Sequence, residues 1–62
     1  MDWERYKNMD PHLLVGIVNT KIRNDYLDLD ELCATHDLDK LELIQKLGDA
    51  GYDYVEAQRQ FR

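Results

Sequence analysis

The chain has 62 residues, 44% of them hydrophobic, which fits one globular domain with a small core rather than a disordered segment. No stretch approaches the roughly 20 apolar residues of a membrane span, and the charged start lacks the apolar segment of a signal peptide. The one cysteine cannot form an internal disulfide. We therefore expect a cytoplasmic protein with no membrane partner. The formal net charge is −5, and all of it falls between positions 27 and 39, because the charges of the other segments cancel.

Residues 1–9 place two aromatic side chains, Trp3 and Tyr6, among charged neighbours. We expect a short tail here, which can include one helical turn, and a single domain over residues 10–62. A large aromatic side chain near a terminus supplies apolar area that a small fold lacks, so Trp3 is predicted to dock on the core. Contact with a partner is the alternative role for Trp3.

The first long helix is predicted to begin at Asp10 and Pro11, because Asp is a favoured N-cap and Pro is favoured at the first helical position. It is predicted to end near Asp25. Val15 should then face outward or lie in a subunit contact. Gly16, which costs about 1 kcal/mol relative to Ala in a helix, should allow the close approach of another helix or an aromatic ring. Apolar residues at spacings of three and four form the stripe that we expect to face the core: Leu13, Leu14, Ile17, Val18, Ile22 and Tyr26.

Residues 28–51 predict two short helices that start alike. Glu31 follows Asp28 by three residues, and Glu42 follows Asp39 in the same way, so each Asp can cap free N–H groups of a first helical turn. These caps and the helix dipole explain most of the acidic charge. Apolar spacing predicts the inward faces, which are Leu29, Leu32, Cys33 and His36 in the first helix and Leu41, Leu43, Ile44, Leu47 and Ala50 in the second.

The turn between these two helices consists of Asp37 and Leu38. A turn this short forces the second helix to leave at a steep angle, with Leu38 pointing inward. The result is a helix-turn-helix arrangement in outline. Gly51 is predicted to end the second helix in a left-handed backbone conformation.

After Gly51 the pattern changes to alternation. Tyr52–Val55 and Arg59–Arg62 alternate as strands do, and Glu56–Gln58 is a plausible turn between them. A two-stranded hairpin is marginal alone, so it must lean on the helices. The predicted fold class is therefore mainly α: a three-helix helix-turn-helix core with a short C-terminal β-hairpin, in the order of a winged helix.

Two resemblances support this fold. The leucine-rich segment from Leu38 to Tyr54, which ends in Ala-Gly-Tyr, resembles the recognition helix and wing entry of many bacterial regulators. A longer pattern of D-P-x-x-L-L, N-T-K-x-R, L-D-x-L-C, A-G-Y-x-Y and a terminal Q-F runs through nearly the whole chain. It consists of Asp10, Pro11, Leu13, Leu14, Asn19, Thr20, Lys21, Arg23, Leu29, Asp30, Leu32, Cys33, Gly51, Tyr52, Tyr54, Gln60 and Phe61.

On this longer pattern the chain resembles a family of very short bacterial proteins known as a domain of unknown function. The resemblance implies a stand-alone bacterial domain and brings no activity with it. Arg59 departs from the pattern, because an Asn is expected before the final Gln-Phe. The polar run from Asn19 to Arg23 can be a contact site or can bond to neighbouring loops. We favour the second role, with Lys21 and Arg23 pairing with the acidic caps of the next helix.

The candidate reactive residues do not indicate an enzyme. Cys33 lies on an apolar stripe and is predicted to be a small buried residue rather than a nucleophile. His36 is expected to be partly buried and His12 exposed, and no acid or thiol at ligand spacing completes a metal site with them. The dispersed glycines form no phosphate loop. We therefore expect no catalytic, metal or cofactor site.

Two functions remain as hypotheses. The first is a protein-interaction or structural module that contacts an unknown protein partner or forms a homodimer, with Trp3, Tyr6, Val15, Tyr26 and Tyr54 as candidate contacts. The alternative is weak or partner-assisted DNA binding through Lys40, Gln45, Lys46, Arg59 and Arg62. The acidic charge disfavours a nucleic-acid partner, because affinity for DNA depends largely on neutralising phosphates.

Overall fold

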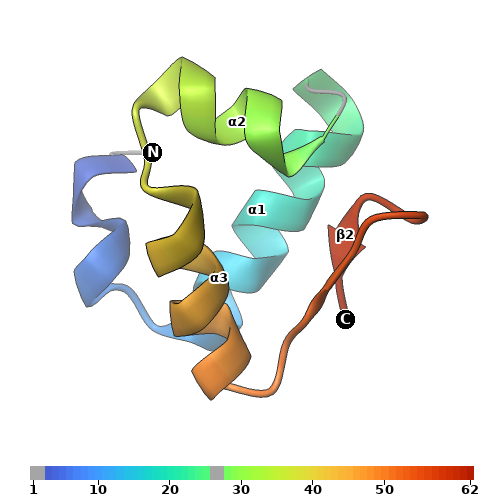
Figure 1. Ribbon diagram of the computed structural model, residues 1–62. Coiled ribbons are helices and arrows are strands. Elements are labelled where there is room, and N and C mark those ends of the chain that lie inside the picture. The colour runs from blue at the N-terminus through green and yellow to red at the C-terminus, as the bar shows by residue number, and fades with distance from the viewer. Residues whose placement is uncertain (1–2, 26–27) are drawn as a thin grey trace.

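The computed structural model describes residues 3–25 and 28–62. Within them it contains the 3-10 helix η1 (Trp3–Asn8), the three α-helices α1 (Pro11–Asp25), α2 (Leu29–His36) and α3 (Lys40–Asp49), and one antiparallel hairpin of β1 (Tyr54–Val55) and β2 (Gln60–Phe61). Figure 1 shows η1 and the hairpin on opposite sides of the molecule, with α1 and α3 between them and α2 across one end. The predicted fold class is confirmed.

Helix α1 begins as its sequence predicts. Pro11 is the first helical residue, and Asp10 caps the helix by accepting a hydrogen bond at its Oδ1 from the backbone N–H of His12 at 2.9 Å. The helix ends at Asp25, again as predicted. Tyr26, which was expected to complete the apolar stripe, lies outside the described residues.

The buried face of α1 is rotated from the predicted one. Val15 is only 7% exposed, so the prediction that it faces outward is wrong. It lies three residues before Val18 and seven before Ile22, and therefore shares their side of the helix. Leu13 is 59% exposed, so its predicted place in the core is also wrong. Six large apolar residues along α1 are more than one face can bury, and contacts with the rest of the fold select which of them are covered.

The caps of α2 and α3 confirm the local predictions. Asp28 accepts a hydrogen bond from the N–H of Glu31 at 2.9 Å, and Asp39 accepts one from the N–H of Glu42 at 3.2 Å. The turn between the helices is closed by Asp37, whose φ of 55° is left-handed.

Two further predictions on α3 have opposite outcomes. Gly51 has the predicted left-handed conformation, with a φ of 94°. Leu41, expected on the inward face, is 77% exposed, so that prediction is wrong. It lies in the first turn of α3, and the inward side there is filled by Leu43 and, one turn later, by Leu47.

The hairpin pairs Tyr54 with Phe61 and Val55 with Gln60. Arg59, predicted to lie in the second strand, instead belongs to the turn and has a φ of 53°. An L-residue other than Asn or Asp rarely adopts this left-handed conformation. The Asn that we expected at this position would adopt this conformation more readily than Arg59 does.

The core combines side chains from every element except β1. Trp3 docks as predicted: it is 8% exposed, and its ring stacks on His36 with ring centroids 4.9 Å apart. Helix η1, which lies in the segment predicted to be a tail, thus supplies part of the core. The buried hydrophobic side chains are Trp3, Tyr6, Leu14, Val15, Val18, Ile22, Leu29, Leu32, Cys33, Leu43, Leu47 and Phe61.

Candidate functional site

Three of the five side chains predicted to contact a protein partner are buried in the core. Trp3, Tyr6 and Val15 are between 5% and 8% exposed and belong to the core, so they cannot form an exposed patch. The core of so short a chain needs them, which is the physical reason that little of their surface is left for a partner. The fourth candidate, Tyr26, is outside the described residues.

The fifth candidate, Tyr54, has a structural role. Its hydroxyl oxygen accepts a hydrogen bond from the N–H of Leu29 at 3.2 Å, and its ring lies against Phe61 with centroids 5.1 Å apart. The first turn of α2 is thereby tied to the hairpin, because this N–H has no partner within its own helix.

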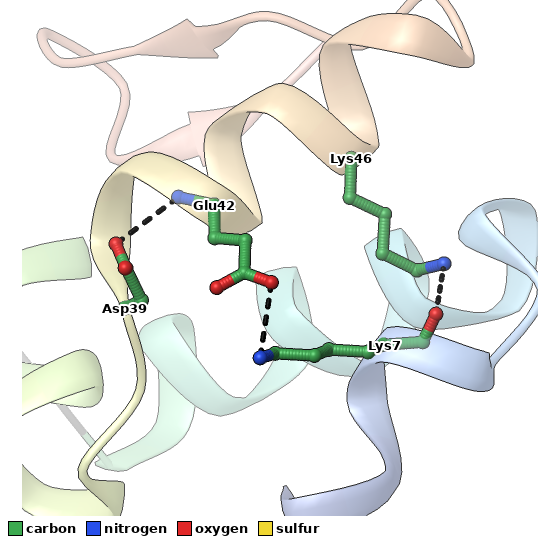
Figure 2. A network of polar contacts seen from close by, with 4 residues as sticks. All are labelled: Lys7, Asp39, Glu42 and Lys46. Atoms are coloured by element: carbon green, nitrogen blue, oxygen red, sulfur yellow. Dashed lines mark hydrogen bonds and ion pairs between the residues drawn. The ribbon is translucent and has the colours of Figure 1, made fainter.

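The lysines predicted to contact DNA already bind groups of the protein. Lys40 pairs with Asp30 at 2.6 Å. This hydrogen bond raises the pKa of Lys40 above its usual value, and Glu56 adds to the effect. Lys46 donates to the backbone carbonyl of Lys7 in η1 at 3.0 Å, as Figure 2 shows.

The candidate DNA contacts do not lie along one strip. Lys46 contacts η1, whereas Arg59 lines a groove of about 390 Å³ between the hairpin turn and α1. Figure 1 places η1 and the hairpin on opposite sides of the helical core. Gln45 and Arg62, the other two candidates, are exposed.

A second groove of about 530 Å³ runs between η1 and α3. The ion pair of Lys7 with Glu42, at 3.1 Å, bridges the two elements (Figure 2). Burial raises the pKa of Tyr6 in this region, with a further contribution from Glu42. The groove is lined by Tyr6, Lys7, Pro11, Glu42, Gln45, Lys46, Asp49 and Ala50.

Asn19 has the neighbour-bonding role that was favoured for the polar run of α1. Its side-chain Nδ2 donates to the carbonyl oxygen of Phe61 at 3.0 Å, and its Oδ1 accepts from the N–H of Phe61 at 2.8 Å. The amide therefore satisfies β2 as a neighbouring strand would. Lys21 pairs within its own helix, with Asp25 at 3.3 Å, rather than with the acidic cap Asp28 of α2 as expected.

The most distinctive surface lies on α1, where Leu13, Gly16 and Thr20 are exposed and Ile17 is half-buried at the edge of the core. We define the α1 face as Leu13, Gly16, Ile17 and Thr20, which follow one another at helical spacings of three, one and three residues. They line an open hollow of about 450 Å³ together with His12 and Lys21. A Cβ added at Gly16 would meet no atom of the described chain within 4 Å, so the predicted close neighbour at Gly16 is not found there.

Sequence reasoning missed this face, although a signal was available. Residues 13–20 contain no charged side chain, and only three of the eight are buried. A run of that length without charge implies that part of it is exposed and apolar. Of the described residues, Leu13 and Leu41 are the large apolar side chains that remain exposed.

Cys33 and His12, two of the residues considered for chemistry, are engaged in packing and hydrogen bonding. Cys33 is 4% exposed, and burial raises the pKa of its thiol, with a further contribution from Asp30. A thiol held protonated in this way is a poor nucleophile. The exposed His12 makes a hydrogen bond through its Nδ1 with the Tyr52 hydroxyl at 2.8 Å.

The described part of the chain contains no group of three or more His, Cys, Asp or Glu side chains placed to hold a metal ion. Among the helices of residues 3–25 and 28–62, none has the length and apolar character needed to cross a membrane.

Comparison with known proteins identifies the family. Searches among curated proteins and among solved structures gave no match. A family model described as a domain of unknown function (DUF4250) matches residues 8–61, which is most of the chain and includes α1, α2, α3 and the hairpin. This match confirms the resemblance that the sequence pattern indicated. The chain belongs to the family described as a domain of unknown function, DUF4250.

Proposed function

We propose that this protein is a non-enzymatic protein-interaction module and that the α1 face is its contact surface. The observation that carries the proposal is the exposed, uncharged side of α1, where Leu13 keeps 59% of its surface in solvent beside a glycine with open space above it. An exposed apolar surface next to a recess is typical of a protein contact site.

The energetics favour coverage of this surface by a partner. Complete burial of a leucine side chain is worth about 1.5–3 kcal/mol, and much of that gain is still available at Leu13. The absence of a side chain at Gly16 lets the backbone of a partner approach closely. The face is also held firmly, because α1 packs through Leu14, Val18 and Ile22 and is tied to β2 through Asn19.

In-cell photo-crosslinking tests this proposal with a matched control. A photoreactive amino acid replaces Leu13 in one variant and Leu41 in another, in cells that naturally make the protein. Leu41 is the control because it is the same side chain and is 77% exposed, but lies on α3. We expect discrete protein adducts from position 13 and none from position 41. Equal adducts from both positions, or none from either, would contradict the proposal.

DNA binding is the second candidate, favoured by the helix-turn-helix order of α2 and α3. The charges of these helices oppose DNA binding, because Lys40 is paired with Asp30 and the start of α2 carries Asp28 as its N-cap together with Asp30 and Glu31. NMR titration of labelled protein with a mixed-sequence duplex tests it at low and then moderate salt. We expect an unchanged spectrum. Shifts confined to Lys40–Asp49 and the hairpin that fade as salt rises would establish DNA binding instead.

A further inference from the structure

We infer that the partner of the α1 face is a second copy of this chain, docked with the two α1 helices antiparallel. The inference rests on the proposed function and deepens it by naming the occupant. Three features favour this occupant: the order of side chains along the face, the charges at its two ends and the location of the remaining acidic charge.

The side chains of the α1 face are complementary to themselves in the antiparallel direction. Along the helix the face reads large, small, large, small: Leu13, Gly16, Ile17, Thr20. An antiparallel copy centred between Gly16 and Ile17 places Leu13 opposite Thr20 and Ile17 opposite Gly16. Leu13 and the exposed part of the half-buried Ile17 then each meet a small side chain, so the two surfaces interdigitate.

A parallel copy lacks this fit. It would place each large side chain of the face against itself and each small one against itself. Leu13 would meet Leu13 at one end, and the recess at Gly16 would face another recess. Packing contacts would be lost at the recess, because a void deprives the atoms that line it of partners.

The charges at the ends of α1 favour the same direction. Asp10 lies just before the helix, and Lys21 lies near its other end beside the hollow. An antiparallel copy brings Lys21 of one chain within about two residues, or 3 Å along the axis, of Asp10 of the other, a gap that a flexible lysine spans. The twofold symmetry makes this contact twice. A parallel copy would instead bring Lys21 close to Lys21.

Both charged groups are exposed to solvent and can make this contact beside their existing bonds, which for Asp10 is the cap through Oδ1. Asp10 is exposed, and the Lys21 side chain is 45% exposed, with a bond to Asp25 inside its own helix. Complementary rim charges of this kind set the orientation of an interface more than its strength.

The net charge also selects this face. Two copies of formal charge −5 repel each other, and the excess lies between positions 27 and 39, at the starts of α2 and α3. The α1 face itself carries no charged side chain. Two chains therefore meet with least repulsion through α1.

The expected dimer is weak. A helix of 15 residues is about 22 Å long, and one such helix offers less area than the roughly 1,200 Å² buried in a standard stable interface. We expect a dissociation constant on the order of 100 µM. Sedimentation equilibrium and NMR dilution from roughly ten times below to ten times above that concentration measure it, with shifts expected at Leu13, Gly16, Ile17 and Thr20.

A variant that fills the recess tests the face without harming the fold. Gly16→Gln adds a side chain where the monomer has open space, at a position where Gly is a poor helix former, so its melting temperature should stay the same or rise. The dissociation constant of the dimer should rise at least tenfold. The control Leu41→Gln removes an exposed apolar side chain elsewhere and should leave the dimer unchanged.

Orientation is tested with single cysteines in a Cys33→Ala background. A short bifunctional thiol reagent should join a Leu13→Cys chain to a Thr20→Cys chain faster than it joins either chain to itself. Faster joining of like chains would overturn the antiparallel arrangement.

The failure of this inference is distinguishable from failure of the proposed function. A chain that stays monomeric up to 1 mM, ten times the expected constant, would overturn the second copy as occupant. If position 13 still crosslinks in cells to adducts other than the mass of two copies, the interaction module stands with a different partner. A dimer that Gly16→Gln and Leu41→Gln affect equally would overturn the α1 face as its interface.

Discussion

Arg59 is the residue whose backbone fits its side chain least well. Its φ of 53° lies in the left-handed region, which costs an ordinary L-residue roughly 1 kcal/mol relative to residues that adopt it readily. The only other positive φ among non-glycine residues of the described chain is at Asp37, and Asp tolerates this region better. The hairpin turn therefore carries a local cost that a single substitution can remove.

Arg59→Asn should stabilise the protein by about 0.5–1 kcal/mol, because Asn adopts the left-handed conformation more easily. Urea denaturation followed by circular dichroism measures the change in the free energy of unfolding. Ala57→Asn, at an exposed position of the same turn without a positive φ, is the matched control and should give no gain. An equal gain from both variants would show that the effect is not conformational.

At the scale of single elements, α1 connects the helices α2 and α3 to the hairpin. It packs on α2 and α3, and Asn19 joins it to β2 through two hydrogen bonds, at 2.8 and 3.0 Å, to the backbone of Phe61. A hairpin with two-residue strands has little stability of its own. The amide of Asn19 is thus a main support of the hairpin.

Asn19→Ala should destabilise the protein by about 1–3 kcal/mol, because it leaves the N–H and carbonyl of Phe61 without these partners in a partly buried place. Hydrogen exchange of the Phe61 amide should accelerate in the variant. Thr20→Ala, at the exposed neighbouring position, should change neither quantity appreciably. Unchanged exchange at Phe61 in Asn19→Ala would mean that the hairpin is held by other contacts.

The elements also show which features a sequence can predict. The caps at Asp28 and Asp39 and the left-handed Gly51 were predicted correctly, because each depends on residues within one helical turn. The centres of the apolar faces, such as Val18, were also predicted correctly, but their edges were not, as Val15 and Leu13 on α1 show, because burial depends on segments far along the chain. Apolar spacing identifies a stripe, but it does not say which edge of a broad stripe is covered.

The same limit applied to the candidate site. Trp3, Tyr6 and Val15 are predicted contacts because a small core does not cover every large or apolar side chain, but the core takes all three. What stays exposed instead is Leu13 with Gly16, on the far side of α1. Competition among apolar residues for a small core is a property of the whole chain, and local patterns do not resolve it.

At the scale of the whole molecule, both ends of the chain help to close the core. Phe61 covers it from the hairpin side, whereas Trp3 and Tyr6 cover it from η1 on the opposite side. The family match begins at residue 8 and does not include η1. The sequence likewise predicted a tail before residue 10. The packing of η1 on the core is therefore the feature of the structure that neither the family match nor the sequence prediction includes.

Trp3→Ala should therefore destabilise the whole domain, by about 3 kcal/mol, the lower end of the cost of removing a buried tryptophan, because Trp3 lies near a chain end. Small domains have only about 5–15 kcal/mol of stability, so the midpoint of urea denaturation should fall markedly. Lys7→Ala, in the same helix, is the control. It removes an exposed ion pair with Glu42 and should leave the midpoint nearly unchanged.

If both variants unfold at the wild-type midpoint, η1 is a tail that rests on the domain, and the fold is complete from Asp10 onward. If only Trp3→Ala shifts the midpoint, the folded unit begins at η1, because a side chain outside the cooperative unit would not change its global unfolding.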